Sequence, residues 1–178
     1  SGVGKQRHER IRPVAITAFS AWWFLPFVLP LCFYVAFTDL REMRITNQAV
    51  IALIVVFLLV GLIALPFDQY LWRLAQLGIV LLVTIALNAA GVMGAGDSKF
   101  IAAAAPFVAM GDVQFLIALY AASLLAAFAT HRLAKHSPLR RVAPHWASWD
   151  QENKKFPMGF PLGATLALYL GFGAVFGS

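Results

Sequence analysis

Long runs of apolar residues constrain this chain more than any other feature of its sequence. Five runs contain 18 or more residues, enough for a helix to cross the ~30 Å hydrocarbon core of a bilayer. Of the 178 residues, 61% are hydrophobic and only 12% are charged, which excludes an ordinary water-soluble domain. We therefore expect an all-α, polytopic membrane protein. The five runs are Val14–Thr38, Asn47–Pro66, Tyr70–Ala90, Val113–Thr130 and Met158–Gly177.

A sixth apolar run is too short to span a bilayer by itself. Phe100–Met110 has 11 residues and would rise roughly 16 Å as a helix, about half of the hydrocarbon core. The polar segment before it, Gly94–Lys99, must therefore lie partly at membrane depth. The sequence predicts a bundle of six transmembrane helices in which the fourth is short or broken.

The chain contains no internal repeat and no separate soluble domain, so we expect one integral membrane domain over residues 1–178. Residues 1–13 form a basic arm, and its first two residues, Ser1-Gly2, are typical of a scar left after removal of an expression tag. Residues 131–156 form a basic loop between the last two spans. A single cysteine, Cys32, lies in an apolar run and provides neither a disulfide nor a cysteine zinc site.

Counting membrane crossings places two acidic residues on the same side of the bilayer. Asp39 ends the first span, the second and third spans go out and return, and Asp97 precedes the fourth apolar run. Nine basic residues fall on that side, which the positive-inside rule identifies as cytoplasmic. The basic arm falls on the other side, and an arm lying along the membrane surface, or a truncation, would account for it. The nine are Arg41, Arg44, Lys99, Arg132, Lys135, Arg140, Arg141, Lys154 and Lys155.

Asp39 and Asp97 are the most informative residues, because an ionised carboxylate at bilayer depth costs at least a few kcal/mol and normally has a partner or a task. Each has a simpler interpretation: Asp39 as an interfacial helix end beside Arg41 and Arg44, and Asp97 as a cap of the fourth helix. Together, two carboxylates on one face of a bundle can share a proton. One then acts as base on a water and the other as acid toward the substrate.

Two glycines beside Asp97 suit the same chemistry. Gly94 and Gly96 lack Cβ atoms, so the backbone of an extended peptide can approach the carboxylates closely. They also allow the helix to break at membrane depth, where irregular backbone is tolerated if it is buried in protein or lines a wet cavity. Lys99, two residues after Asp97, can either favour the charged form of that carboxylate or reach lipid headgroups.

Three segments together resemble the type IV prepilin peptidases, which are aspartic peptidases of the GxGD type with six spans. The resemblance is closest to the small, peptidase-only members that serve Flp/Tad-type pili. It covers nearly the whole chain from Thr38, although relatives often have Pro where this chain has Thr46, and the third segment is a looser match. The three segments are Phe37–Asn47, Gly94–Lys99 and Phe156–Pro161.

The resemblance implies that Asp39 and Asp97 are the catalytic pair of a leader peptidase. Such an enzyme removes a short basic leader from type IV prepilins at the cytoplasmic face of the bacterial inner membrane. We expect five residues to shape the substrate site: Gly94, Gly96, Lys99, Pro157 and Gly159. Larger family members methylate the new pilin N-terminus through a loop with paired cysteines, and we expect no such activity here because no segment matches that loop.

Further partners follow from the membrane location. We expect contacts with membrane lipids and with pilus or secretion assembly proteins, and none with nucleic acid, since the net charge of +6 is small and the basic residues flank apolar runs. No cofactor or metal is expected, because the histidines at positions 131, 136 and 145 have no neighbouring cysteine or suitably spaced acidic ligand. We expect Glu42, Asp150 and Glu152, or anionic lipid, to receive the basic leader.

Two other classes of function remain open at this stage. A proton-coupled transporter would use Asp39 and Asp97 as a relay, but it would need polar residues strung across the bilayer. A non-catalytic assembly subunit would use the same residues only to pair with Arg41 and Lys99.

Overall fold

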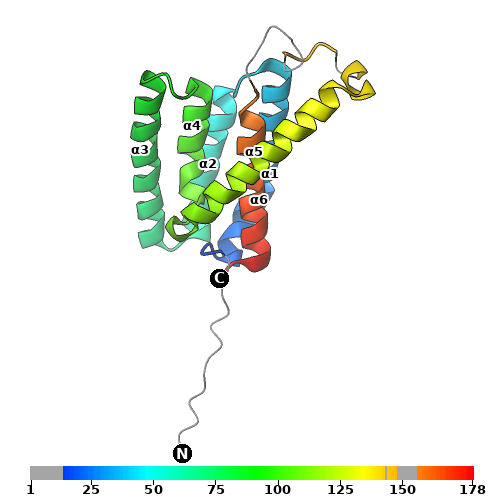
Figure 1. Ribbon diagram of the computed structural model, residues 1–178. Coiled ribbons are helices and arrows are strands. Elements are labelled where there is room, and N and C mark those ends of the chain that lie inside the picture. The colour runs from blue at the N-terminus through cyan, green and yellow to red at the C-terminus, as the bar shows by residue number, and fades with distance from the viewer. Residues whose placement is uncertain (1–13, 143, 148–155) are drawn as a thin grey trace, which may run out of the picture.

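The computed structural model describes residues 14–142, 144–147 and 156–178. It confirms an all-α bundle of six helices (Figure 1). The basic arm 1–13 and residues 148–155 of the predicted loop, with Asp150 and Glu152, lie outside the described residues. The helices are α1 (Ala18–Glu42), α2 (Asn47–Ala64), α3 (Phe67–Ala89), α4 (Ala95–Ala104), α5 (Val113–Lys135) and α6 (Gly159–Phe176).

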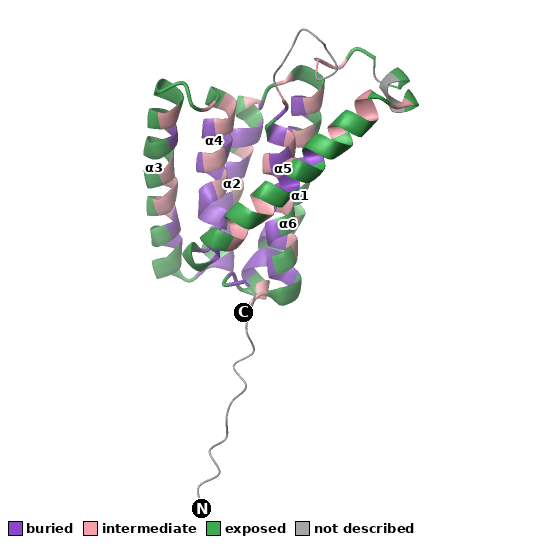
Figure 2. Ribbon diagram, viewed as in Figure 1, coloured by how far each residue is buried: buried purple, intermediate pink, exposed green. Residues whose placement is uncertain are grey.

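Five of these segments are long and apolar enough to cross a membrane. They are α1, α2, α3, the continuous segment Met110–Lys135 that contains α5, and α6. Figure 2 shows that the outward faces of α3 and α5 are largely exposed, and many of the exposed side chains are large and apolar, such as Leu82 and Leu125. Such a surface suits lipid and not water.

The fourth helix is short and broken, as predicted. α4 has ten residues and continues as the 3-10 turn η1 (Ala105–Phe107), followed by a second 3-10 turn, η2 (Met110–Asp112). Pro106 lacks a backbone N–H and therefore cannot continue the α-helical hydrogen bonding. The break lies in protein, because α4 packs against α2, α3 and α6.

Two sequence-based boundaries were wrong. α5 extends to Lys135, five residues beyond the predicted end at Thr130, and Pro138–Arg141 form another 3-10 turn, η3, so the start of the 131–156 loop is helical. The side chain of Arg73, near the start of α3, is buried. Its Nη1 donates a hydrogen bond to the carbonyl of Pro106 at 3.0 Å, which compensates for burial of the guanidinium.

Helices α1 and α6 pack antiparallel at close range through small residues. A Cβ atom at Gly163 would lie 2.9 Å from the carbonyl oxygen of Cys32, and one at Gly173 would lie 3.1 Å from the Cβ of Ala21. Small residues let membrane helices approach this closely, and the gain is van der Waals contact along both backbones. The pairing brings the end of α1 beside the beginning of α6.

A buried carboxylate ties several elements together at the opposite end of the bundle. Asp112 accepts hydrogen bonds from the backbone N–H groups of Ala15 and Ile16 and from the hydroxyl of Tyr169, the last at 2.6 Å. The Tyr169 hydroxyl also accepts a bond from the N–H of Ala109. Asp112 thus anchors the chain before α1 to α6.

Replacing Asp112 with Ala should lower the free energy of unfolding by about 3 kcal/mol or more, because it leaves buried donors without an acceptor. Thermal unfolding in detergent measures the effect. Asp68→Ala is the matched control, since Asp68 is exposed in the first turn of α3. Equal stability of the two variants would contradict the anchoring role.

Candidate active site

Asp39 and Asp97 lie at the same end of the bundle, as the count of membrane crossings predicted. Asp39 is in the last turn of α1 and Asp97 in the first turn of α4. Figure 1 shows the end of α1 and the connection from α3 to α4 at one end, away from the C-terminus. The two carboxyl groups are close enough for their charges to interact.

The beginning of α6 holds the Asp39 carboxylate. Asp39 is only 4% exposed, and its Oδ2 accepts hydrogen bonds from the backbone N–H of Gly159 at 2.7 Å and of Phe160 at 3.3 Å. The first N–H groups of a helix have no partner within it and carry partial positive charge, so they suit a carboxylate. No donor among the described residues reaches Oδ1. Asp39 is therefore anchored through one oxygen, at the end of α1, and forms no ion pair with Arg41 or Arg44.

Glycine at position 159 makes this contact possible. A Cβ atom there would lie 2.9 Å from both Cβ and Cγ of Asp39, and 3.0 Å from Cγ1 of Ile45. Both distances are too short for carbon atoms in ordinary contact, so a larger residue would push α6 away from α1. The absence of a side chain at position 159 thus lets the N–H of Gly159 come close enough to hold the Asp39 carboxylate.

Asp97 follows Gly96, which approaches Ile45. Ile45 is buried between α1 and α2, and a Cβ atom at Gly96 would lie 3.4 Å from its Cβ. Ile45 thus contacts both Gly159, next to Asp39, and Gly96, next to Asp97, and it links the two halves of the site. A Cβ atom at Gly94 would lie 3.2 Å from Oδ2 of Asp97, so this carboxylate is directed toward a position without a side chain.

Asp97 is half-buried, and within the described segments its carboxylate forms neither a hydrogen bond nor an ion pair. The interpretation of Asp97 as a cap of α4 is not supported, because Gly94 is the N-cap residue and no side chain caps the helix. A half-buried carboxylate with open coordination beside an anchored one is an arrangement that can hold a water molecule and exchange a proton with it.

The model of the type IV leader peptidase family matches residues 15–130, which is more than half of the chain and includes both aspartates. The chain belongs to the type IV leader peptidase family. Comparison with curated proteins and with solved structures gives no match.

The match to the leader peptidase family ends before α6, so the contact between Asp39 and Gly159 lies outside the matched part of the chain. The structure therefore places Gly159, expected from the sequence to shape the substrate site, in direct contact with Asp39.

Three other residues expected to bind substrate have different surroundings in the structure. Gly94 faces Asp97, Gly96 faces Ile45, and Pro157 is buried just before α6. Their role in substrate binding stays a prediction.

Lys99 does not pair with Asp97. Its Nζ donates a hydrogen bond to Oδ1 of Asn47 at 3.1 Å, in an exposed position at the start of α2. The only ion pair among the described residues joins Arg44 and Glu42 at 3.2 Å. No group of three His, Cys, Asp or Glu side chains that could hold a metal ion occurs in the described part of the chain.

Tyr120, a residue of α5 near the site, was not predicted from the sequence. Its hydroxyl is 3.9 Å from Sδ of Met158, the residue before α6, and is close enough to Asp97 for electrostatic interaction. Tyr120 is the only tyrosine in the fifth apolar run. A lone tyrosine in an apolar run could have indicated a functional position. The sequence alone, however, does not tell which face of an almost wholly apolar helix points inward.

Replacing Gly159 with Ala should lower the free energy of unfolding by about 1–3 kcal/mol, because the new methyl group overlaps Asp39 and Ile45. Gly171→Ala is the control in the same helix, since a Cβ atom there would meet nothing within 4 Å. It should be neutral or stabilising by up to about 1 kcal/mol. Thermal unfolding in detergent compares the two variants, and equal melting temperatures would contradict the tight contact at Gly159.

Proposed function

We propose that this chain is a prepilin leader peptidase of the small Flp/Tad type. It cleaves the basic leader from type IV pilin precursors at the cytoplasmic membrane face, and residues 1–178 form one integral membrane peptidase domain. The observation that carries the proposal is the pairing of Asp39 with Asp97. Two carboxylates from separate helices meet at one end of an apolar bundle, and neither forms an ion pair among the described residues.

The proposed mechanism is hydrolysis without a covalent intermediate. Two interacting carboxylates in a partly dehydrated site are unfavourable when both are ionised, so in this mechanism the pair holds one shared proton. A water between Asp39 and Asp97 gives a proton to the ionised carboxylate as its oxygen attacks the scissile carbonyl. The protonated carboxyl group then supplies a proton to the leaving nitrogen. Cleavage thus yields a new carboxylic acid on the leader and a new amine on the remaining protein.

The anchoring of Asp39 orients its carboxylate for the attack by water. Its Oδ2 is held by two N–H groups of α6, which leaves Oδ1 as the oxygen available to water. Because α1 and α6 are packed at close range, this oxygen is fixed before a substrate arrives, and little reorganisation is needed during the reaction.

The cytoplasmic location rests on the basic residues that share the end of the bundle with the two aspartates. Arg41, Arg44 and Lys99 are exposed there, and Arg132 and Lys135 are in the last turn of α5. We propose that this end faces the anionic inner leaflet of the bacterial inner membrane. Prepilins, membrane lipids and pilus or secretion assembly proteins are the proposed partners.

The structure favours a peptidase over a proton-coupled transporter. A relay needs polar groups along its path, but the bundle core between the Asp112 cluster and the aspartate pair contains packed rings of Phe24, Phe57 and Phe107, each fully buried. A non-catalytic subunit that pairs its acids with Arg41 and Lys99 is also disfavoured, because Lys99 binds Asn47 instead.

Asp39→Asn and Asp97→Asn should each reduce cleavage by about 10²–10⁴-fold or more, since each removes one member of the acid–base pair while nearly keeping its shape. The measurement is cleavage of a pilin precursor by the purified chain in liposomes, with thermal unfolding as the test of folding. Asp68→Asn, at the other end of the bundle, should keep full activity.

Full activity of either Asp39→Asn or Asp97→Asn would contradict a two-carboxylate mechanism. A proton flux that both variants abolish, without any proteolysis by the unchanged protein, would instead identify a transporter.

A further inference from the structure

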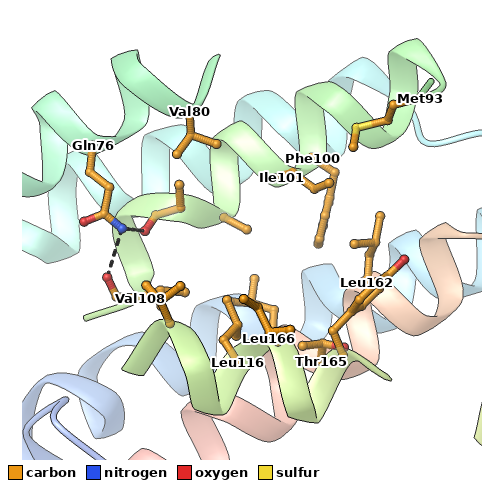
Figure 3. Close-up of a pocket in the computed structure, with 15 residues that line it drawn as sticks. Gln76, Val80, Met93, Phe100, Ile101, Val108, Leu116, Leu162, Thr165 and Leu166 are labelled. Atoms are coloured by element: carbon orange, nitrogen blue, oxygen red, sulfur yellow. Dashed lines mark hydrogen bonds between the residues drawn. The ribbon is translucent and has the colours of Figure 1, made fainter. Parts of the chain in front are cut away.

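An apolar cavity of about 370 Å³ lies among α3, α4, α5 and α6 (Figure 3). This volume is within the range of ~300–1,000 Å³ found for ligand pockets. In Figure 3 the side chains of Phe100, Ile101, Leu116, Leu162 and Leu166 surround the open space. Only Gln76, Tyr120 and Thr165 contribute polar side chains to the lining.

The wall formed by α4 begins at Phe100, on the face of the helix that also carries Asp97. Phe100, Ile101 and Ala104 line the cavity and follow Asp97 by three, four and seven residues. This spacing places all four residues on one face of the helix. Since each residue rises about 1.5 Å, the wall extends to roughly 10 Å from Asp97 toward the membrane interior.

The wall formed by α6 begins at Leu162, three residues after Gly159, which binds Asp39. Leu162 and Leu166 line the cavity and follow Gly159 by three and seven residues, so they lie on the same face of α6. Tyr120, whose hydroxyl is near enough to Asp97 for electrostatic interaction, completes the boundary from α5. The aspartates do not line the cavity, but its α4 and α6 walls begin one helical turn beyond Asp97 and Gly159 and continue on their membrane side.

The polar groups of the lining are largely satisfied within the protein. Nε2 of Gln76 donates to the carbonyls of Ala105 at 2.7 Å and Val108 at 3.1 Å, and the Thr165 hydroxyl donates to the carbonyl of Pro161 at 2.7 Å. Oε1 of Gln76 is the exception: it is buried and has no partner in the described segments. An occupant of this cavity thus gains mainly by burying apolar surface.

We propose that this cavity is the subsite for the apolar residues of the substrate that follow the scissile bond on its membrane side. The inference rests on the proposed peptidase function. The length of roughly 10 Å matches about three extended residues at ~3.3 Å each. The proposed occupant is an extended segment whose side chains fill the space between α4 and α6, because a peptide must be locally extended at the bond that is cut.

The test changes side-chain size in the cavity and, in compensation, in the substrate. The cut site of a precursor cleaved by the unchanged protein is mapped, and the three residues on its membrane side are replaced one at a time by Ala and by Trp. Ala104→Phe fills the cavity and should lower kcat/KM for the native precursor at least about 10-fold. An Ala at one of the three substrate positions should restore it. Leu116→Ala enlarges the cavity and should improve cleavage of the Trp precursor at that same position.

Ala118→Phe is the matched control, because Ala118 is exposed on α5 and does not line the cavity. It should leave every kcat/KM value unchanged. The proposal is overturned if Ala104→Phe lowers cleavage of all precursors equally and Leu116→Ala does not change the preference for residue size. That result would assign the cavity to a lipid acyl chain or to packing, while the peptidase function would stand. Absence of cleavage by the unchanged protein would overturn both proposals.

Discussion

The bond between the Asp39 carboxylate and the first N–H groups of α6 is the interaction on which the proposed site depends. A carboxylate that is 4% exposed is costly unless donors replace the lost water. Backbone N–H groups at a helix start supply such donors, and that of Gly159 comes within 2.7 Å because position 159 has no side chain. The same close packing of α1 and α6 sets the register of the bundle, since the two helices stay in contact as far as Ala21 and Gly173.

The bundle uses buried carboxylates in two different ways at its two ends. Asp112 has a donor at each of its oxygens, all of them from the protein itself, which is the condition of a structural anchor. Asp39 has donors at one oxygen, and Asp97 has none in the described part of the chain. Asp39 and Asp97 keep carboxylate oxygens without protein donors, and such oxygens can bind water and a peptide. The difference in hydrogen bonding thus separates the structural role of Asp112 from the proposed catalytic role of Asp39 and Asp97.

Much of the fold followed from the sequence, because membrane-spanning length and the parity of crossings are set by elementary geometry. The short fourth helix was predictable from the 11 residues of Phe100–Met110, and the common side of Asp39 and Asp97 from the number of spans between them. The burial of Arg73, the anchor at Asp112 and the position of Tyr120 were not predictable. In helices that are apolar all round, the hydrophobic pattern does not show which face is inward, so only tertiary packing reveals these contacts.

The central claim is that Asp39 and Asp97 face one shared site in the folded protein. Cysteine cross-linking tests it most directly: Asp39→Cys and Asp97→Cys are combined in a Cys32→Ser background and treated in native membranes with a short bifunctional thiol reagent. The account predicts an efficient intramolecular cross-link for this pair and none for Asp39→Cys combined with Asp112→Cys, at opposite ends of the bundle. No cross-link between positions 39 and 97, or one no more efficient than between 39 and 112, would contradict it.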